Sequence, residues 1–247
     1  MHSYLFPPSY AHWLADRLPG QAHESLATCD ACVMLKPEGL TRDQGPFLPG
    51  LKCCTYFPYL PNFSLGAISD EKFNSVAKLG ILLPVGIYPS LQYQQISHKF
   101  GKEGFGKKSE LLCPFFQKNT DSCGIWNHRP GVCTSYFCKS NRGREGLKYW
   151  SKIEQYLNHF EFALSQEIMR RMGFGENELI FGQSAISPET DPEERSYFLQ
   201  SAWMNWFGKE HSFYKEALKI GRSIKSEELE KILDPDILKL EAEIQIK

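Results

Sequence analysis

The residues of this chain best suited to chemistry are its eight cysteines, all of which lie before residue 139. They form one Cys-x-x-Cys pair, one adjacent pair and four more widely spaced positions: Cys29, Cys32, Cys53, Cys54, Cys113, Cys123, Cys133 and Cys138. A Cys-x-x-Cys pair lets two thiolates reach one metal from a single tight turn, in zinc and iron–sulfur sites alike. Because six further cysteines share the same half of the chain, we expect all eight to serve as metal ligands.

Metal ligation is favoured over disulfides because no export or membrane signal is recognised. Residues 1–20 lack a charged segment followed by an apolar one, and Pro7 and Asp16 interrupt them. The most apolar run, residues 79–88, is short and contains Pro84. The expected location is the cytoplasm, where thiols stay reduced.

The adjacent pair Cys53-Cys54 bears on how the thiols divide. In an extended segment, neighbouring side chains point to opposite faces, so the two cysteines are expected to serve different metals, or one a metal and the other the interior. Eight thiolates divide naturally into two groups of four. The spacing therefore predicts two four-cysteine sites, or one cluster with spare thiols.

The sequence spacing between the cysteines indicates which metal they bind. Structural zinc modules often show two Cys-x-x-Cys pairs, and this chain has one, with long intervals after Cys54. Cys113 is followed by Pro114, as is the last cysteine of some cluster-binding runs. These features favour an iron–sulfur cluster, of the four-iron, four-sulfur kind, with zinc as the alternative.

Positive charge near thiolates compensates their negative charge and tunes redox potential. Arg129 lies between His128 and Pro130 in an otherwise apolar segment, and it is the candidate for contact with the cofactor. His128 itself could replace a thiolate, but with eight cysteines available a hydrogen-bonding or surface role is favoured. No Ser-His-Asp set, phosphate-binding loop or carboxylate pair stands out elsewhere.

A family resemblance rests on the second group of cysteines. Cys113-Pro114-Phe115-Phe116, then Cys123-Gly-Ile-Trp-Asn-His-Arg-Pro-Gly-Val-Cys133, then Cys138, resembles the YkgJ-type cysteine-cluster proteins, described as zinc- or iron-chelating. Trp126 stands where that pattern usually has Tyr. Their first motif, CxxCxxCC, is compact, whereas twenty residues separate Cys32 from Cys53 here. The resemblance implies that the protein chelates a metal. A related group, the flagellin lysine methylases, is similar in its cysteine motifs and is linked to iron–sulfur chemistry. It implies a methylase as an alternative function, although no methyl-donor site is recognised in this sequence.

The elements that must hold these cysteines are mainly helical. The pattern predicts a mainly α fold with little β structure, made of an irregular, metal-stabilised cysteine-rich domain (1–145) and a helical domain (146–247). Residues 27–68 are expected to be irregular. Helices are expected over 10–18, 70–82, 146–172, 192–207 and 212–222, and over 226–247 with a break at Asp234-Pro235.

Composition limits the partners. The formal net charge is -1, and charged residues make up 23% of the chain, so neither nucleic acid nor a membrane surface is expected as a partner. Three functions remain open: a redox or accessory iron–sulfur protein, a zinc-stabilised module that binds a protein through its helical half, and a metal-dependent group-transfer enzyme.

Overall fold

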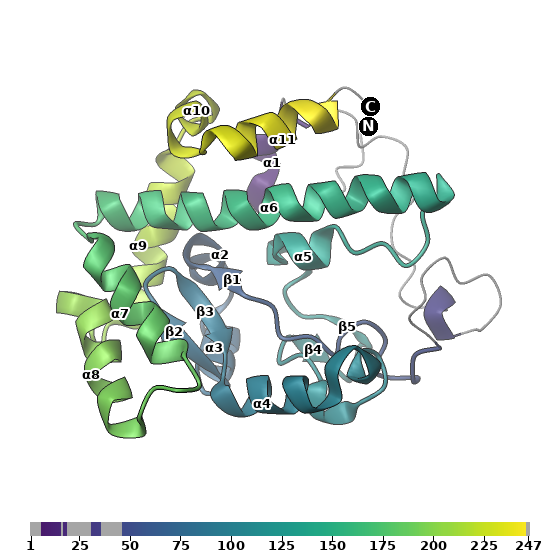
Figure 1. Ribbon diagram of the computed structural model, residues 1–247, viewed down its shortest axis with the longest axis horizontal. Coiled ribbons are helices and arrows are strands. Elements are labelled where there is room, and N and C mark those ends of the chain that lie inside the picture. Colours follow the sequence, from purple (N-terminus) through teal and green to yellow (C-terminus); the bar gives the residue numbers. More distant parts are fainter. Residues whose placement is uncertain (1–5, 16, 19–30, 36–45, 246–247) are drawn as a thin grey trace.

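The computed structural model describes residues 6–15, 17–18, 31–35 and 46–245, and Figure 1 shows how their elements are arranged. Helices account for 63% of these residues and strands for 6%, which confirms the prediction of a mainly α fold with little β structure. The helices in chain order are α1 (Pro8–Leu14), α2 (Asn62–Ala67), α3 (Asp70–Ala77), α4 (Leu91–Phe100), α5 (Gly131–Thr134), α6 (Gly143–Arg171), α7 (Glu176–Ile186), α8 (Pro192–Trp203), α9 (Glu210–Ser223), α10 (Leu229–Ile232) and α11 (Pro235–Gln245).

Two small antiparallel sheets complete the described fold. Strands β1 (Leu60–Pro61), β3 (Gly86–Pro89) and β2 (Gly80–Leu83) form one sheet in that order. The other sheet is the pair of β4 (Phe116–Gln117) and β5 (Ser122–Cys123). Short 3-10 helices connect the larger elements: Val33–Leu35, Gly101–Gly104, Ser109–Leu111, Trp126–His128, Met204–Trp206 and Ser226–Glu228.

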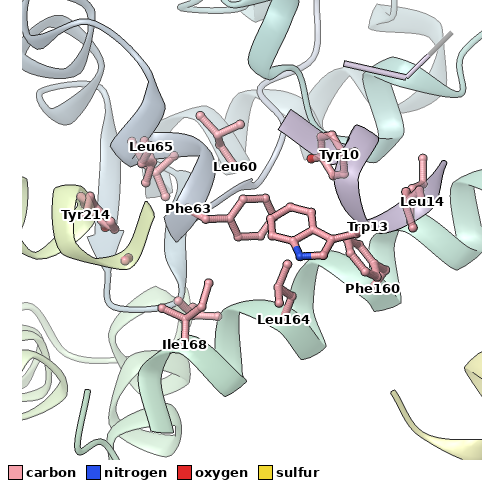
Figure 2. Close-up of a cluster of buried hydrophobic side chains, with 14 of the residues drawn as sticks. Tyr10, Trp13, Leu14, Leu60, Phe63, Leu65, Phe160, Leu164, Ile168 and Tyr214 are labelled. Atoms are coloured by element: carbon pink, nitrogen blue, oxygen red, sulfur yellow. The ribbon is translucent and has the colours of Figure 1, made fainter. Parts of the chain in front are cut away.

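Helix α6 is the long central helix on which several other elements pack, and it runs horizontally across the view in Figure 1. Its apolar residues recur every three or four positions, and that face is buried against α5, α9 and α11. The helix also contacts α1 through Trp13 and α2 through Asn62. Figure 2 shows Trp13 of α1 and Phe63 of α2 beside Phe160 and Leu164 of α6. The indole N–H of Trp13 donates to the Ile224 carbonyl at 3.0 Å, so the centre of the core joins distant parts of the chain.

Both sides of the predicted 145/146 domain boundary contribute to this core. One continuous cluster of buried apolar side chains extends from Phe6 to Ile244. Trp203 and Tyr214 reach across to the sheet, where they donate to the carbonyls of Leu82 at 3.1 Å and Leu83 at 2.7 Å. The division into two domains stays a prediction. Within the described residues, no helix is both long and apolar enough to cross a bilayer.

Most of the predicted helices are present with shifted ends, and one was partly wrong. The helix expected over 70–82 ends at Ala77, and residues from Gly80 onward form β2. Ile81 pairs with Tyr88 in β3, and a Cβ on Gly80 would lie 2.6 Å from the Tyr88 carbonyl oxygen. The close strand pairing thus needs glycine, which the helical pattern did not reveal. The helix expected to reach residue 207 ends at Trp203.

Candidate metal centre

Four of the eight cysteines, from separate segments of the chain, affect one another's ionisation. Cys53 ends a turn, Cys113 follows the 3-10 helix Ser109–Leu111, Cys123 is the last residue of β5, and Cys133 lies in α5. Backbone hydrogen bonds hold the segments together. The Cys113 N–H donates to the Cys54 carbonyl at 2.8 Å, and Cys123 pairs with Phe116 in the β4–β5 hairpin.

The position of Cys133 is set by the packing of α5 on α6, which lie one below the other in Figure 1. The Gly131 N–H at the start of α5 donates to Oε1 of Glu161 in α6 at 2.6 Å. A Cβ on Gly131 would lie 2.5 Å from Cβ of Leu157, so glycine is what lets the two helices approach so closely. Glu161 is only 1% exposed, and it also accepts a hydrogen bond from the Tyr10 hydroxyl.

Small electrostatic effects link these four thiols. Burial raises the pKa of Cys133 well above its ordinary value, and the nearby thiols of Cys113, Cys123 and Cys53 raise it further. Burial likewise raises the pKa of Cys113 to about 12, with Cys123 and Cys53 as lesser causes. The charges of Cys53 and Cys123 therefore disfavour ionisation of Cys113 and Cys133, as nearby like charges do.

Cys133 lies at a crowded but open part of the surface. The residue is exposed to solvent, while the protein surrounding its thiol is the largest cause of its raised pKa. Cys133 is therefore the exposed member of the four, and Cys53, Cys113 and Cys123 are half-buried.

The remaining described cysteines lie around this group. Cys32 is buried with Met34 and Phe47 in a small cluster, and Cys53 and Cys138 pack against that cluster. Cys54 is in hydrogen-bond contact with the Cys53 thiol. Cys29 lies outside the described residues.

The expectation that Cys53 and Cys54 point to opposite faces was wrong. Residues 51–53 form a turn, in which Lys52 has a φ of 53° and the Cys54 N–H donates to the Leu51 carbonyl at 3.1 Å. The alternation of side chains holds only for extended backbone. The turn instead keeps the two thiols together.

Among the described residues, no three or more His, Cys, Asp or Glu side chains are arranged to hold a metal ion. In this conformation the four thiols therefore do not form a complete set of metal ligands. A cysteine side chain has one rotatable bond before its sulfur, so a change of rotamer redirects the sulfur without moving the backbone. The backbone contacts described above fix the backbone positions of these cysteines, whichever rotamers their side chains adopt.

Two nearby cations act on thiols of this group. Lys52 is only 4% exposed, its Nζ donates to the Asp121 carbonyl at 3.1 Å, and it pairs with the Asp121 carboxylate. This contact ties the turn of Cys53 to the hairpin of Cys123, and the charge of Lys52 lowers the pKa of Cys53 against the larger effects of Cys54 and burial.

Arg129, the predicted cofactor contact, acts on Cys123. Its guanidinium covers the Trp126 ring at 3.8 Å from the ring centroid, and Nη1 donates to the Trp126 carbonyl at 3.1 Å. Its charge opposes the rise in the pKa of Cys123 that burial causes. Direct contact with a cofactor stays a prediction.

Two residues near the site were missed by sequence reasoning. Glu161 falls on the apolar face of α6, four residues after Leu157 and three before Leu164, and a lone acid on such a face is a usable signal. Lys72 had no such signal. Its Nζ donates to the Gly124 carbonyl, a contact that only the fold reveals.

Comparison of the chain with family models, with curated proteins and with solved structures found no match. The resemblance to the YkgJ-type proteins therefore rests on the residues of the motif alone.

Proposed function

We propose that this protein binds a metal centre through Cys53, Cys113, Cys123 and Cys133, and that the centre is an iron–sulfur cluster with a redox or accessory role. The observation that supports the proposal is the electrostatic effect of Cys113, Cys123 and Cys53 on Cys133, from segments up to eighty residues apart in sequence (133 against 53). The alternative is that these cysteines act only as small buried apolar residues, which metal analysis distinguishes.

The chemistry of the group supports this proposal. Thiolates are the ligands of iron–sulfur clusters and of structural zinc, and both use four. Apolar surroundings help to shield a cluster from solvent, and Phe115 and Ile125, beside Cys113 and Cys123, are buried. When bound, a cluster supplies one-electron transfer, while the chain orients the thiols, through α5 above all, and supplies the nearby charge of Lys52.

Metal loading would displace protons. The raised pKa values mean that Cys113 and Cys133 carry protons at neutral pH when no metal is bound. Because the ligand is the thiolate, metal binding releases those protons and strengthens as the pH rises. This behaviour is shared by iron and zinc centres, so it supports a thiolate centre without choosing the metal.

The test is anaerobic purification followed by analysis of iron, zinc and acid-labile sulfide and by a visible spectrum of the same sample. We expect a coloured protein that contains iron and sulfide and bleaches reversibly on reduction. A colourless protein with stoichiometric zinc would replace the redox role with that of a zinc-stabilised module that binds a protein partner. A protein that holds neither metal, even after anaerobic reconstitution, would overturn the proposal.

A further inference from the structure

A hollow of about 250 Å³ opens beside the thiol group, between the start of α3 and the 3-10 helix Trp126–His128. Its polar lining includes Ser69, Lys72, Cys123, Trp126, Asn127 and His128. The hollow therefore shares one wall, Cys123, with the proposed metal centre.

Lys72 gives the hollow its charge. It is the only charged residue of the lining, and its ammonium donates to the Gly124 carbonyl. Among the described residues, no carboxylate lies within ion-pair distance of Lys72. An ammonium has three donors, so at least one remains for a ligand after the contact with Gly124. A half-buried cation without a described counter-charge favours the binding of one anionic group.

His128 adds unused hydrogen-bonding capacity. Its Nδ1 is buried, and no described residue bonds to it. Burial, followed by the charges of Arg222 and Lys72, lowers the pKa of His128 and so favours the neutral ring, which has one donor and one acceptor nitrogen. A buried polar atom without a partner is uncommon in folded proteins and calls for a ligand, an ion or water.

Trp126 supplies the apolar part of the wall. Its side chain is 42% exposed, and the Arg129 guanidinium covers its ring. An exposed indole beside a cation suits a small molecule with an apolar body and one charged end.

We propose that this hollow binds a small organic carboxylate, with its carboxylate on Lys72 and its apolar body against Trp126. A single cation with neutral donors around it matches one negative charge better than the two charges of a phosphate. The ligand would lie next to Cys123, which makes the hollow a substrate or effector site for the neighbouring centre. This proposal goes beyond metal binding, because the residues that line the hollow have the positions described whichever metal the cysteines bind.

The test is a ligand-observed NMR titration of the purified full-length protein, with benzoate and acetate as probes and inorganic phosphate as competitor. We expect millimolar or tighter binding of benzoate, weaker binding of acetate, and a loss of at least about tenfold in benzoate affinity in Lys72→Met, because a charge-assisted hydrogen bond disappears. Lys72→Arg keeps the charge and should bind benzoate more tightly than Lys72→Met. Lys78→Met, an exposed change at the end of the same helix, should bind as the unmodified protein does.

Several outcomes would overturn the carboxylate site. They are failure of both probes to bind at millimolar concentration, equal binding to Lys72→Met and the unmodified protein, and displacement of benzoate by phosphate at lower concentration than benzoate itself requires. Circular dichroism of each variant separates lost binding from lost folding. Metal analysis of the same samples distinguishes this failure from failure of the metal centre, because either result can occur without the other.

Discussion

Replacing Cys53 with serine is expected to remove most of the bound metal, whereas replacing its neighbour Cys54 with serine is expected to leave the centre in place. The two residues are adjacent in one turn, and the charge of Cys53 is among the causes that raise the pKa of Cys113, Cys123 and Cys133. Serine keeps the size of the side chain and lacks the thiolate that soft metals require. Metal per chain, measured by elemental analysis after anaerobic purification of both variants, checks this prediction.

The adjacent pair is a matched control, because both changes alter the same turn. An equal loss of metal in the two variants would mean that Cys54 is also a ligand, or that the turn itself has been disrupted. Thermal unfolding of the metal-free variants separates these explanations. Full retention of metal in Cys53→Ser would contradict the proposed ligand set outright.

The second large effect concerns Glu161. Burial raises the pKa of this carboxyl to about 8, against the opposing effects of the Tyr10 and Gly131 hydrogen bonds. In the unfolded chain the group has an ordinary pKa of 4.5. Between these values the folded protein holds a proton that the unfolded chain has lost, so the free energy of unfolding falls as pH rises. The expected fall from about pH 5 to pH 8 is on the order of 2 to 5 kcal/mol.

Glu161→Gln should abolish most of this pH dependence, because the amide does not titrate and its oxygen still accepts from the Gly131 N–H. Glu161→Ala should also lose the pH dependence, and should be less stable than Glu161→Gln by about 1 to 3 kcal/mol at every pH, because a buried donor is left without a partner. Urea unfolding at several pH values, in the same metal-loading state, measures both effects. An unfolding free energy of Glu161→Gln that falls with pH as steeply as that of the unmodified protein would contradict this account.

Local pattern predicted the longest elements of the fold well. The helix over 146–172 was visible because its apolar residues recur on one face for seven turns, and α6 spans Gly143–Arg171. The Asp191-Pro192 start was visible because capping is local, and the Asp191 side chain accepts from the Glu193 N–H at 2.8 Å. Helices α2, α4 and α7 were missed, and α2 is buried almost throughout, so it shows little polar face to reveal its period.

The candidate site was predictable in its residue types and not in its grouping. Cysteine count and spacing singled out the thiols, but the association of Cys53 with Cys113, Cys123 and Cys133 depends on long-range contacts. The turn at Lys52 keeps the Cys53 and Cys54 thiols together, where opposite faces were expected. Nothing in the sequence marks this lysine as a residue with positive φ. For the same reason, the contacts of Glu161 with α5 and of Lys72 with Gly124 become visible only in the folded chain.

The central claim is that Cys53, Cys113, Cys123 and Cys133 hold one metal centre. The most direct measurement is alkylation of the native protein by iodoacetamide, before and after complete removal of the metal, with each cysteine identified by mass spectrometry of its peptide. We predict that these four cysteines resist alkylation in the metal-loaded protein and become reactive once the metal is removed, at a pH high enough to ionise their thiols. Alkylation of Cys133 at the same rate with and without metal, or fewer than four newly reactive cysteines after removal, would contradict the claim.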